Sequence, residues 1–211
     1  MSKNKFFNTY NLVFIAIMTA LSLVLSEFPK IPIFFLKVDF SDVPIIFSAV
    51  HIHPLAGVFI ALVKNLVGLA STSTMFVGEL SNFILSCAYC LVASLLFYYS
   101  KRTKLKIAIS SVIAALAATI VALATNYFIM IPLYIKLYGL SVLQGYSKAG
   151  FIFSIILPFN LIKFGLETAV FLGLYFGLYK VLHKLKPECR KQNAKDQTHI
   201  DIDIDINIKE V

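Results

Sequence analysis

The chain has 211 residues, of which 59% are hydrophobic and only 14% are charged, and its mean hydropathy is +0.83. Soluble domains carry about 25% charged residues, so the composition excludes a water-soluble globule and indicates an integral membrane protein. The net charge of +8 does not indicate a nucleic-acid-binding protein, because the basic residues gather in the tails and in one short loop, where they indicate membrane topology.

The first predicted helix covers residues 7–26, close to the roughly 20 apolar residues that a membrane span needs. It lacks the small-residue cleavage site of a signal peptide and is followed by further apolar segments, so we expect it to stay in the membrane. Pro29 and Pro32 then break the helix. We expect a loop over residues 30–40.

Five more helices are predicted along the chain. Ser41 or Asp42 is expected to cap the second helix, and Pro44 is tolerated in its first turn. This second helix ends before Pro54 and is short for a full span. The five helices cover residues 42–52, 54–69, 77–99, 107–136 and 151–185. We therefore expect an all-α integral membrane protein with six transmembrane helices.

The lysines and arginines predict the orientation of these helices, because cytoplasmic segments carry the excess of positive charge. One side has Lys3, Lys5, Lys101, Arg102, Lys104, Lys106, Lys180, Lys184, Lys186, Arg190 and Lys191. The other side has only Lys30, Lys37, Lys136 and Lys148. Both termini are thus expected to be cytoplasmic. We divide the chain into a six-helix membrane domain over residues 1–190 and a polar tail over residues 191–211, which is expected to be disordered.

A few polar residues fall inside the predicted spans, where an ionisable side chain costs at least ~2.5–3.5 kcal/mol. Asn160, Lys163 and Glu167 fall within about 60° of one another on a helix, and Glu79 and Asn82 are neighbours three residues apart. The structural alternative is that they join helices, but such a bond contributes only about 0.6 kcal/mol. We therefore expect the group to form a polar binding pocket. For Glu167 the alternative is that pairing with Lys163 is its whole role.

The sequence carries no catalytic or nucleotide-binding motif. It has no G-x-x-x-x-G-K-[ST] loop for phosphates, no H-E-x-x-H zinc motif and no paired aspartates. His51 and His53 lack further ligands for a metal, so they are better explained as part of a loop at the membrane surface. We expect a binding protein that is not an enzyme, with no catalytic residue and no metal.

Several stretches, in this order along residues 7 to 185, resemble the substrate-binding (S) components of energy-coupling-factor (ECF) vitamin transporters, and most closely the riboflavin-specific ones. They are Glu27-Phe28-Pro29, Phe35-Leu36-Lys37-Val38-Asp39-Phe40-Ser41-Asp42-Val43-Pro44, Pro54-Leu55-Ala56-Gly57-Val58, Lys64-Asn65-Leu66, Gly78-Glu79-Leu80-Ser81-Asn82-Phe83, Asn126-Tyr127-Phe128 and Pro158-Phe159-Asn160-Leu161-Ile162-Lys163.

The resemblance implies the six-helix S-component fold in a bacterial cell membrane and a protein that captures riboflavin from the outer face. A separate transmembrane coupling protein and two ATPase subunits would drive delivery inward, so ATP is used only by the partners and no cofactor is expected. Ala16 and Ala20 resemble the family's docking surface for the coupling protein. The alternatives are an S component for another vitamin such as thiamine, or a non-transport membrane subunit. Flavin mononucleotide is left open as a second ligand.

The chemistry of the polar residues suits a flavin independently of the resemblance. A carboxamide can satisfy the ring edge, where an N–H donor lies between two carbonyl acceptors, and a lysine can donate to a ring carbonyl. Aromatic residues would cover the ring faces, and other polar residues would bind the ribityl hydroxyls. We expect Lys163, rather than Lys64, to be the lysine that contacts the ligand. The loop over residues 30–39 is expected to be the lid. The expected substrate-binding residues are Asp39, Lys64, Glu79, Asn82, Asn126, Tyr127, Asn160 and Lys163.

Overall fold

The computed structural model describes residues 9–28, 31–33, 36–71, 76–99, 104–139, 143 and 145–185. Residues 1–172 and 173–211 form two compact units, and the site lies entirely in the first unit. The tail over residues 191–211 lies outside the described residues.

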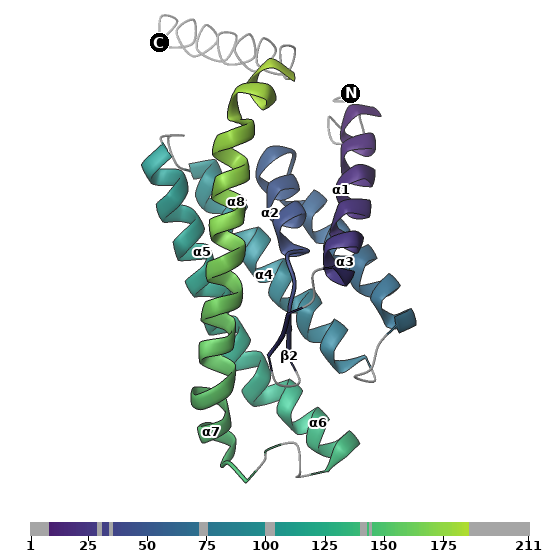
Figure 1. Ribbon diagram of the computed structural model, residues 1–211, viewed down its shortest axis with the longest axis vertical. Coiled ribbons are helices and arrows are strands. Elements are labelled where there is room, and N and C mark those ends of the chain that lie inside the picture. Colours follow the sequence, from purple (N-terminus) through teal and green to yellow (C-terminus); the bar gives the residue numbers. More distant parts are fainter. Residues whose placement is uncertain are drawn as a thin grey trace, which may run out of the picture. The chain divides into compact units, whose positions relative to one another are not determined.

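The described elements are almost all helical (Figure 1). The N-terminal half contains the helices α1 (Thr9–Glu27), α2 (Asp42–His51), α3 (Pro54–Gly68) and α4 (Val77–Tyr99), the strands β1 (Ile31–Ile33) and β2 (Leu36–Val38), and the 3-10 turn η1 (Leu69–Ser71). The C-terminal half contains the helices α5 (Lys104–Thr125), α6 (Ile131–Tyr138), α7 (Lys148–Phe151) and α8 (Leu157–Leu185), with the π-helical segments η2 (Asn126–Met130) and η4 (Ile152–Ile156).

Within the described residues, four stretches are long and apolar enough to cross a membrane, which gives a multi-pass membrane protein. They are Thr9–Glu27, Val77–Tyr98, Leu105–Tyr138 and Lys148–Gly177. The apolar helices α2 and α3 have only 10 and 15 residues, because Ile52 and His53 separate them and α3 begins at Pro54. The six predicted apolar segments are thus all helical, and four of them have the length of a span.

The segment between α1 and α2 corrects the prediction of a loop and of an all-α chain. Ile31 pairs with Val38, Pro32 with Lys37, and Ile33 with Leu36 in an antiparallel hairpin. The apolar residues at both ends of each strand favour this pairing. Each strand of a two-stranded hairpin is an edge strand, where proline is tolerated.

Helix α2 lies at the centre of the first unit and packs against α1, α3 and α4. All its residues from Asp42 to Ala49 are buried. The approach of α3 is close at Gly57, where an added Cβ atom would lie 2.8 Å from Cβ of Ala49 and 3.0 Å from the carbonyl oxygen of Ile45. A side chain at position 57 would therefore force α2 and α3 apart.

Two π-helical segments interrupt the long C-terminal helices and contact each other. Ile131, Phe151, Ile152 and Ile156 form a buried apolar cluster at this contact. Asn126 opens the first π segment, and Asn160 follows the second by one turn. Such segments often occur at functional sites, and both of these lie beside a predicted ligand-binding asparagine.

Candidate functional site

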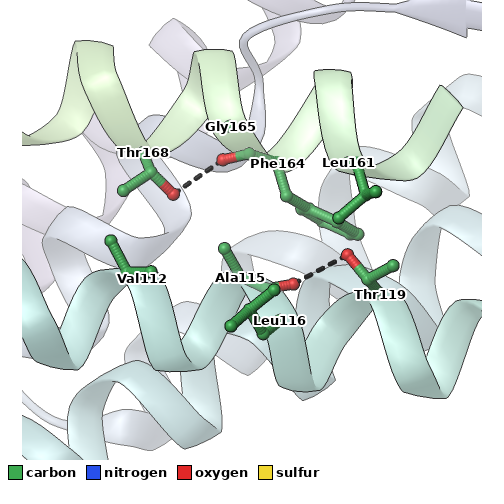
Figure 2. Close-up of a pocket in the computed structure, with 8 residues that line it drawn as sticks. All are labelled: Val112, Ala115, Leu116, Thr119, Leu161, Phe164, Gly165 and Thr168. Atoms are coloured by element: carbon green, nitrogen blue, oxygen red, sulfur yellow. Dashed lines mark hydrogen bonds between the residues drawn. The ribbon is translucent and has the colours of Figure 1, made fainter. Parts of the chain in front are cut away.

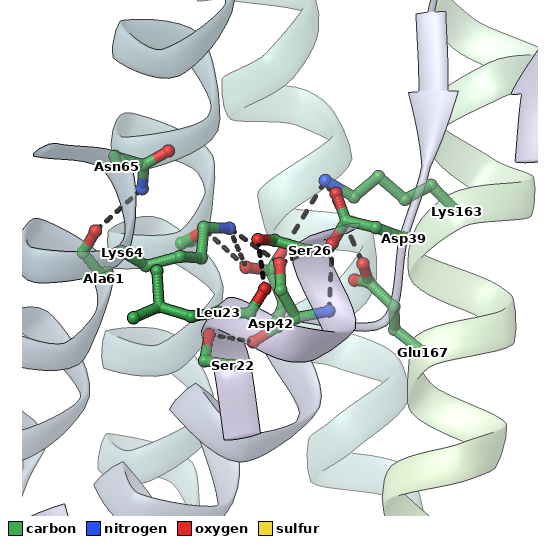
Figure 3. A network of polar contacts seen from close by, with 12 residues as sticks. Ser22, Leu23, Ser26, Asp39, Asp42, Ala61, Lys64, Asn65, Lys163 and Glu167 are labelled. Atoms are coloured by element: carbon green, nitrogen blue, oxygen red, sulfur yellow. Dashed lines mark hydrogen bonds and ion pairs between the residues drawn. The ribbon is translucent and has the colours of Figure 1, made fainter. Parts of the chain in front are cut away.

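A cluster of buried charged side chains lies around the start of α2, where side chains from α3, α4 and α8 reach Asp42 (Figure 3). Its ionisable members, each no more than 7% exposed, are Asp39, Asp42, Lys64, Lys163 and Glu167. Buried charges need partners, because an isolated charge in an apolar interior is very costly. We call these five residues the charged cluster.

Asp42 contacts both lysines of the charged cluster. Its Oδ1 lies 3.6 Å from Nζ of Lys64, and its Oδ2 lies 3.5 Å from Nζ of Lys163. The hydroxyl of Ser86 on α4 donates a hydrogen bond to Oδ1. The sequence assigned Asp42 only a possible capping role, so its central position was missed.

Lys64 connects α3 to the turn that precedes α2. Its ammonium donates a 2.7 Å hydrogen bond to Oγ of Ser41. Ser41 donates both its hydroxyl and its backbone N–H to Oδ1 of Asp39, the latter at 2.9 Å. Ser41 stands at the N-cap position of α2 without a side-chain capping bond, so the predicted cap is wrong: its hydroxyl serves Asp39 and Lys64 instead.

Lys163 and Glu167 lie one turn apart on α8, as their spacing predicts. Nζ of Lys163 is 3.9 Å from Oε1 of Glu167, and both side chains are buried together with Asn160. Neither carboxylate oxygen of Glu167 has a hydrogen-bond partner among the described residues. Among the described residues, Glu167 therefore interacts with its surroundings through the ion pair with Lys163.

Asn160 presents a buried acceptor that the described residues leave unused. The side chain is 3% exposed, and its Nδ2 donates a 2.8 Å hydrogen bond to the carbonyl of Ile156, the last residue of η4. Its Oδ1 has no hydrogen-bond partner in the described part of the chain. A buried acceptor without a partner costs about 1–3 kcal/mol, so it is suited to a ligand N–H.

The predicted residues on η2 lie nearer the surface. Asn126 is partly buried, and its Nδ2 donates to the carbonyl of Ala122 at 2.8 Å. Tyr127 is 41% exposed, and the ammonium of Lys148 lies 4.2 Å from the centre of its ring. The next residue, Phe128, is 73% exposed. No described contact therefore connects Tyr127 or Phe128 to the charged cluster.

Glu79 and Asn82 lie in the first two turns of α4 and are partly buried. Cγ of Glu79 is 3.5 Å from the position that a Cβ atom of Gly68 would take, so Glu79 lies against the end of α3. Asn82 is four residues before Ser86, which bonds to Asp42, and therefore shares its helix face. These residues extend the face of α4 that meets the charged cluster.

Ala16 and Ala20 lie on the exposed face of α1 together with Val13, Ile17 and Val24. This face is apolar, and the small alanine side chains leave room for the close approach of another helix.

An apolar groove of about 180 Å³ runs between α5 and α8 (Figure 2). Its two threonines bond back to their own helices, Thr119 to the carbonyl of Ala115 at 2.9 Å and Thr168 to that of Phe164 at 2.6 Å. The lining contains none of the predicted ligand-binding residues. It offers few polar groups to the edge of a flavin ring, so we do not assign the ligand to it.

Comparison with known proteins gives consistent matches along most of the chain. The family model of the ECF transporter substrate-specific component matches residues 10–175. The riboflavin transporter RibU of Staphylococcus aureus is 34% identical over 82% of this chain and 93% of that protein. The riboflavin transporter FmnP of Bacillus subtilis is 30% identical over 87% of this chain and 95% of that protein.

The fold is similar as well. A solved structure described as the S component of a bacterial ECF transporter has 34% sequence identity and a TM-score of 0.66, and the match covers 81% of this chain and 96% of that one. These relatives are membrane transport components and not enzymes. A membrane bundle with buried charges and an unused buried acceptor agrees with that role, and the chain belongs to the substrate-specific components of ECF transporters.

Proposed function

We propose that the chain is the riboflavin-binding S component of an ECF transporter, which captures the vitamin outside the cell and delivers it inward with a separate coupling protein and ATPases. The observation that carries the proposal is the buried, unpartnered Oδ1 of Asn160, one turn before the ammonium of Lys163. This pair offers one acceptor and a cationic donor on one helix face. An imide edge, with its N–H beside a carbonyl, matches that pair.

Riboflavin carries such an imide edge on a flat, neutral ring, and its ribityl chain carries hydroxyls. In the proposed orientation, Asn160 accepts from the ring N–H and Lys163 donates to the adjacent carbonyl. The ribityl chain then lies toward Asp39, Lys64, Glu79 and Asn82, which are on the elements that face α8 across the charged cluster. Asn126 and Tyr127 lie outside the charged cluster, and we assign them to the rim of the site because η2 contacts η4, which ends one turn before Asn160. The relatives in Staphylococcus aureus and Bacillus subtilis are riboflavin transporters, which supports this ligand.

The proposed topology has six membrane helices in residues 1–190, with both termini in the cytoplasm. The asymmetry of lysines and arginines supports the orientation. In this orientation the hairpin of β1 and β2 lies on the outer side and leads directly into Asp39 and Ser41. We assign it the role of the lid over the ligand. The exposed face of α1 at Ala16 and Ala20 is the proposed docking surface for the coupling protein.

A binding titration tests the function. The protein, purified in detergent without added vitamin, is titrated with riboflavin while the fluorescence of the flavin is followed, and parallel titrations use flavin mononucleotide and thiamine as competitors. We expect saturable quenching of riboflavin fluorescence that excess thiamine does not reverse. Unquenched riboflavin together with saturable thiamine binding, measured by calorimetry, would instead assign the chain to another vitamin.

A further inference from the structure

Asp42 connects the two buried lysines of the charged cluster. Its carboxylate is fully buried in the first turn of α2, and its two oxygens face different helices (Figure 3). Oδ1 lies 3.6 Å from Nζ of Lys64 on α3, and Oδ2 lies 3.5 Å from Nζ of Lys163 on α8. With the bond from Ser86 on α4, one carboxylate holds side chains from three other helices.

The two lysines do not need a shared Asp42 for their charges to be neutralised. Lys163 has a second carboxylate, Glu167, at 3.9 Å, and Lys64 reaches the carboxylate of Asp39 through the hydroxyl of Ser41. Each lysine therefore has an acidic neighbour of its own. What Asp42 adds is a single group shared by both lysines, which fixes the two ammonium groups relative to each other.

The contacts of Lys163 leave its donors available. Its two described carboxylate oxygens lie at 3.5 and 3.9 Å, whereas a charge-assisted N–H···O bond is about 2.7–2.9 Å long. The two carboxylates thus hold the ammonium of Lys163 between them by electrostatic attraction. A ligand would not have to break a short hydrogen bond to either carboxylate. Such a group is oriented and still able to donate.

We propose that Asp42 is a positioning residue for ligand binding, which holds Lys163 for the ring and Lys64 for the ribityl chain of the same ligand. This inference rests on the proposed function, because it gives both lysines a ligand to meet. Asp42 itself acts through the lysines. When it is removed, Lys163 is left with Glu167, one turn along its own helix, and moves toward it.

A double-mutant cycle tests the proposal by measuring the Kd for riboflavin in wild type, Asp42→Asn, Lys163→Met and the double variant. We expect each single substitution to raise the Kd at least tenfold. In the Asp42→Asn background, Lys163→Met should add less than a threefold further loss, because Lys163 is already misplaced. If Lys163→Met weakens binding by the same factor in both backgrounds, Asp42 does not act through Lys163 and the proposal is overturned.

Asp42→Glu separates position from charge, and it decides the matter if Asp42→Asn does not fold. The longer side chain keeps the carboxylate but displaces it from its contacts with Lys64, Lys163 and Ser86, and Asp42 is 0% exposed, so the carboxylate has no solvent to turn to. We expect the Kd to rise at least tenfold, whereas a role in charge neutralisation alone predicts a Kd within twofold of wild type.

Ser48→Ala is the matched control on α2. Ser48 is buried, but its hydroxyl donates to the carbonyl of Pro44 in its own helix at 2.8 Å. The Kd of the Ser48→Ala variant for riboflavin should therefore stay within twofold of wild type. Wild-type protein that does not bind riboflavin overturns the proposed function. Wild-type protein that binds, with Asp42→Asn and Asp42→Glu unaffected, overturns only the positioning role.

Discussion

The hydroxyl of Ser22 on α1 donates a 2.8 Å hydrogen bond to the backbone carbonyl of Ser41, in the turn that precedes α2. Both residues are fully buried. Because the side chain of Ser41 accepts from Lys64, the same turn contacts the charged cluster on one side and α1 on the other. The helix that carries the proposed docking face is thus joined directly to the proposed ligand site.

Loss of this bond should weaken the protein before any ligand is added. Ser22→Ala leaves the buried carbonyl of Ser41 without its donor, which costs about 1–3 kcal/mol in the free energy of unfolding. Unfolding in SDS, followed by circular dichroism, measures the change. Ser26→Ala is the control, since within the described residues the hydroxyl of Ser26 donates to the carbonyl of Leu23 in its own helix at 2.7 Å. Equal losses for both variants would argue against a special role of Ser22.

Lys163→Met should destabilise the apo protein by about 3–5 kcal/mol, because it leaves the buried carboxylate of Glu167 without its cation and Asp42 with Lys64 alone. Adding Glu167→Gln should restore a large part of this loss, since it removes the uncompensated charge. The same SDS unfolding assay applies. A double variant as unstable as Lys163→Met would show that the ion pair with Glu167 contributes nothing to stability.

Asn160→Ala should weaken riboflavin binding by about 5- to 150-fold, the factor that corresponds to a lost buried hydrogen bond of about 1–3 kcal/mol. Asn65→Ala is a closely matched control. Asn65 is 7% exposed and also donates to a carbonyl four residues earlier, that of Ala61, at 2.7 Å. We expect its Kd to remain within twofold of wild type, and similar losses at both positions would point to a general effect of removing buried asparagines.

Ala16→Leu and Ala20→Leu should leave riboflavin binding by the isolated protein unchanged but abolish uptake by cells that supply the coupling protein and the ATPases. The larger side chains fill the space that a close helix contact needs. Ala124→Leu on α5 is the control, because Ala124 is also an exposed alanine on a membrane helix. Uptake that survives both α1 substitutions would place the docking surface elsewhere.

The sequence predicts those features that depend on contacts within one helix. The bounds of α4 match the predicted 77–99, because polar residues precede it and basic residues follow it. Asn160, Lys163 and Glu167 are all buried, as helical periodicity predicts. Both results depend on residues close together in the sequence, so they can be predicted from a single sequence.

Other features depend on partners that are remote in the sequence, and these were missed. Asp42 follows the local rule for a helix start, and only the fold brings Lys64 and Lys163 to its two oxygens. The strands of the hairpin have three residues each and contain Pro32, too short and too interrupted for an alternating pattern to be recognised. The π-helical segments at η2 and η4 have no signature in residue type.

The order of the charged cluster along the chain has a consequence for biosynthesis. Lys64 leaves the ribosome 22 residues after Asp42, whereas Lys163 follows 121 residues after it, or about 6–24 s later at ~5–20 residues per second. The nascent N-terminal half can therefore neutralise Asp42 with Lys64 soon after both have emerged. Helix α8 brings its own counter-charge in Glu167, so that Lys163 has a carboxylate one turn along its own helix as well as Asp42 on α2.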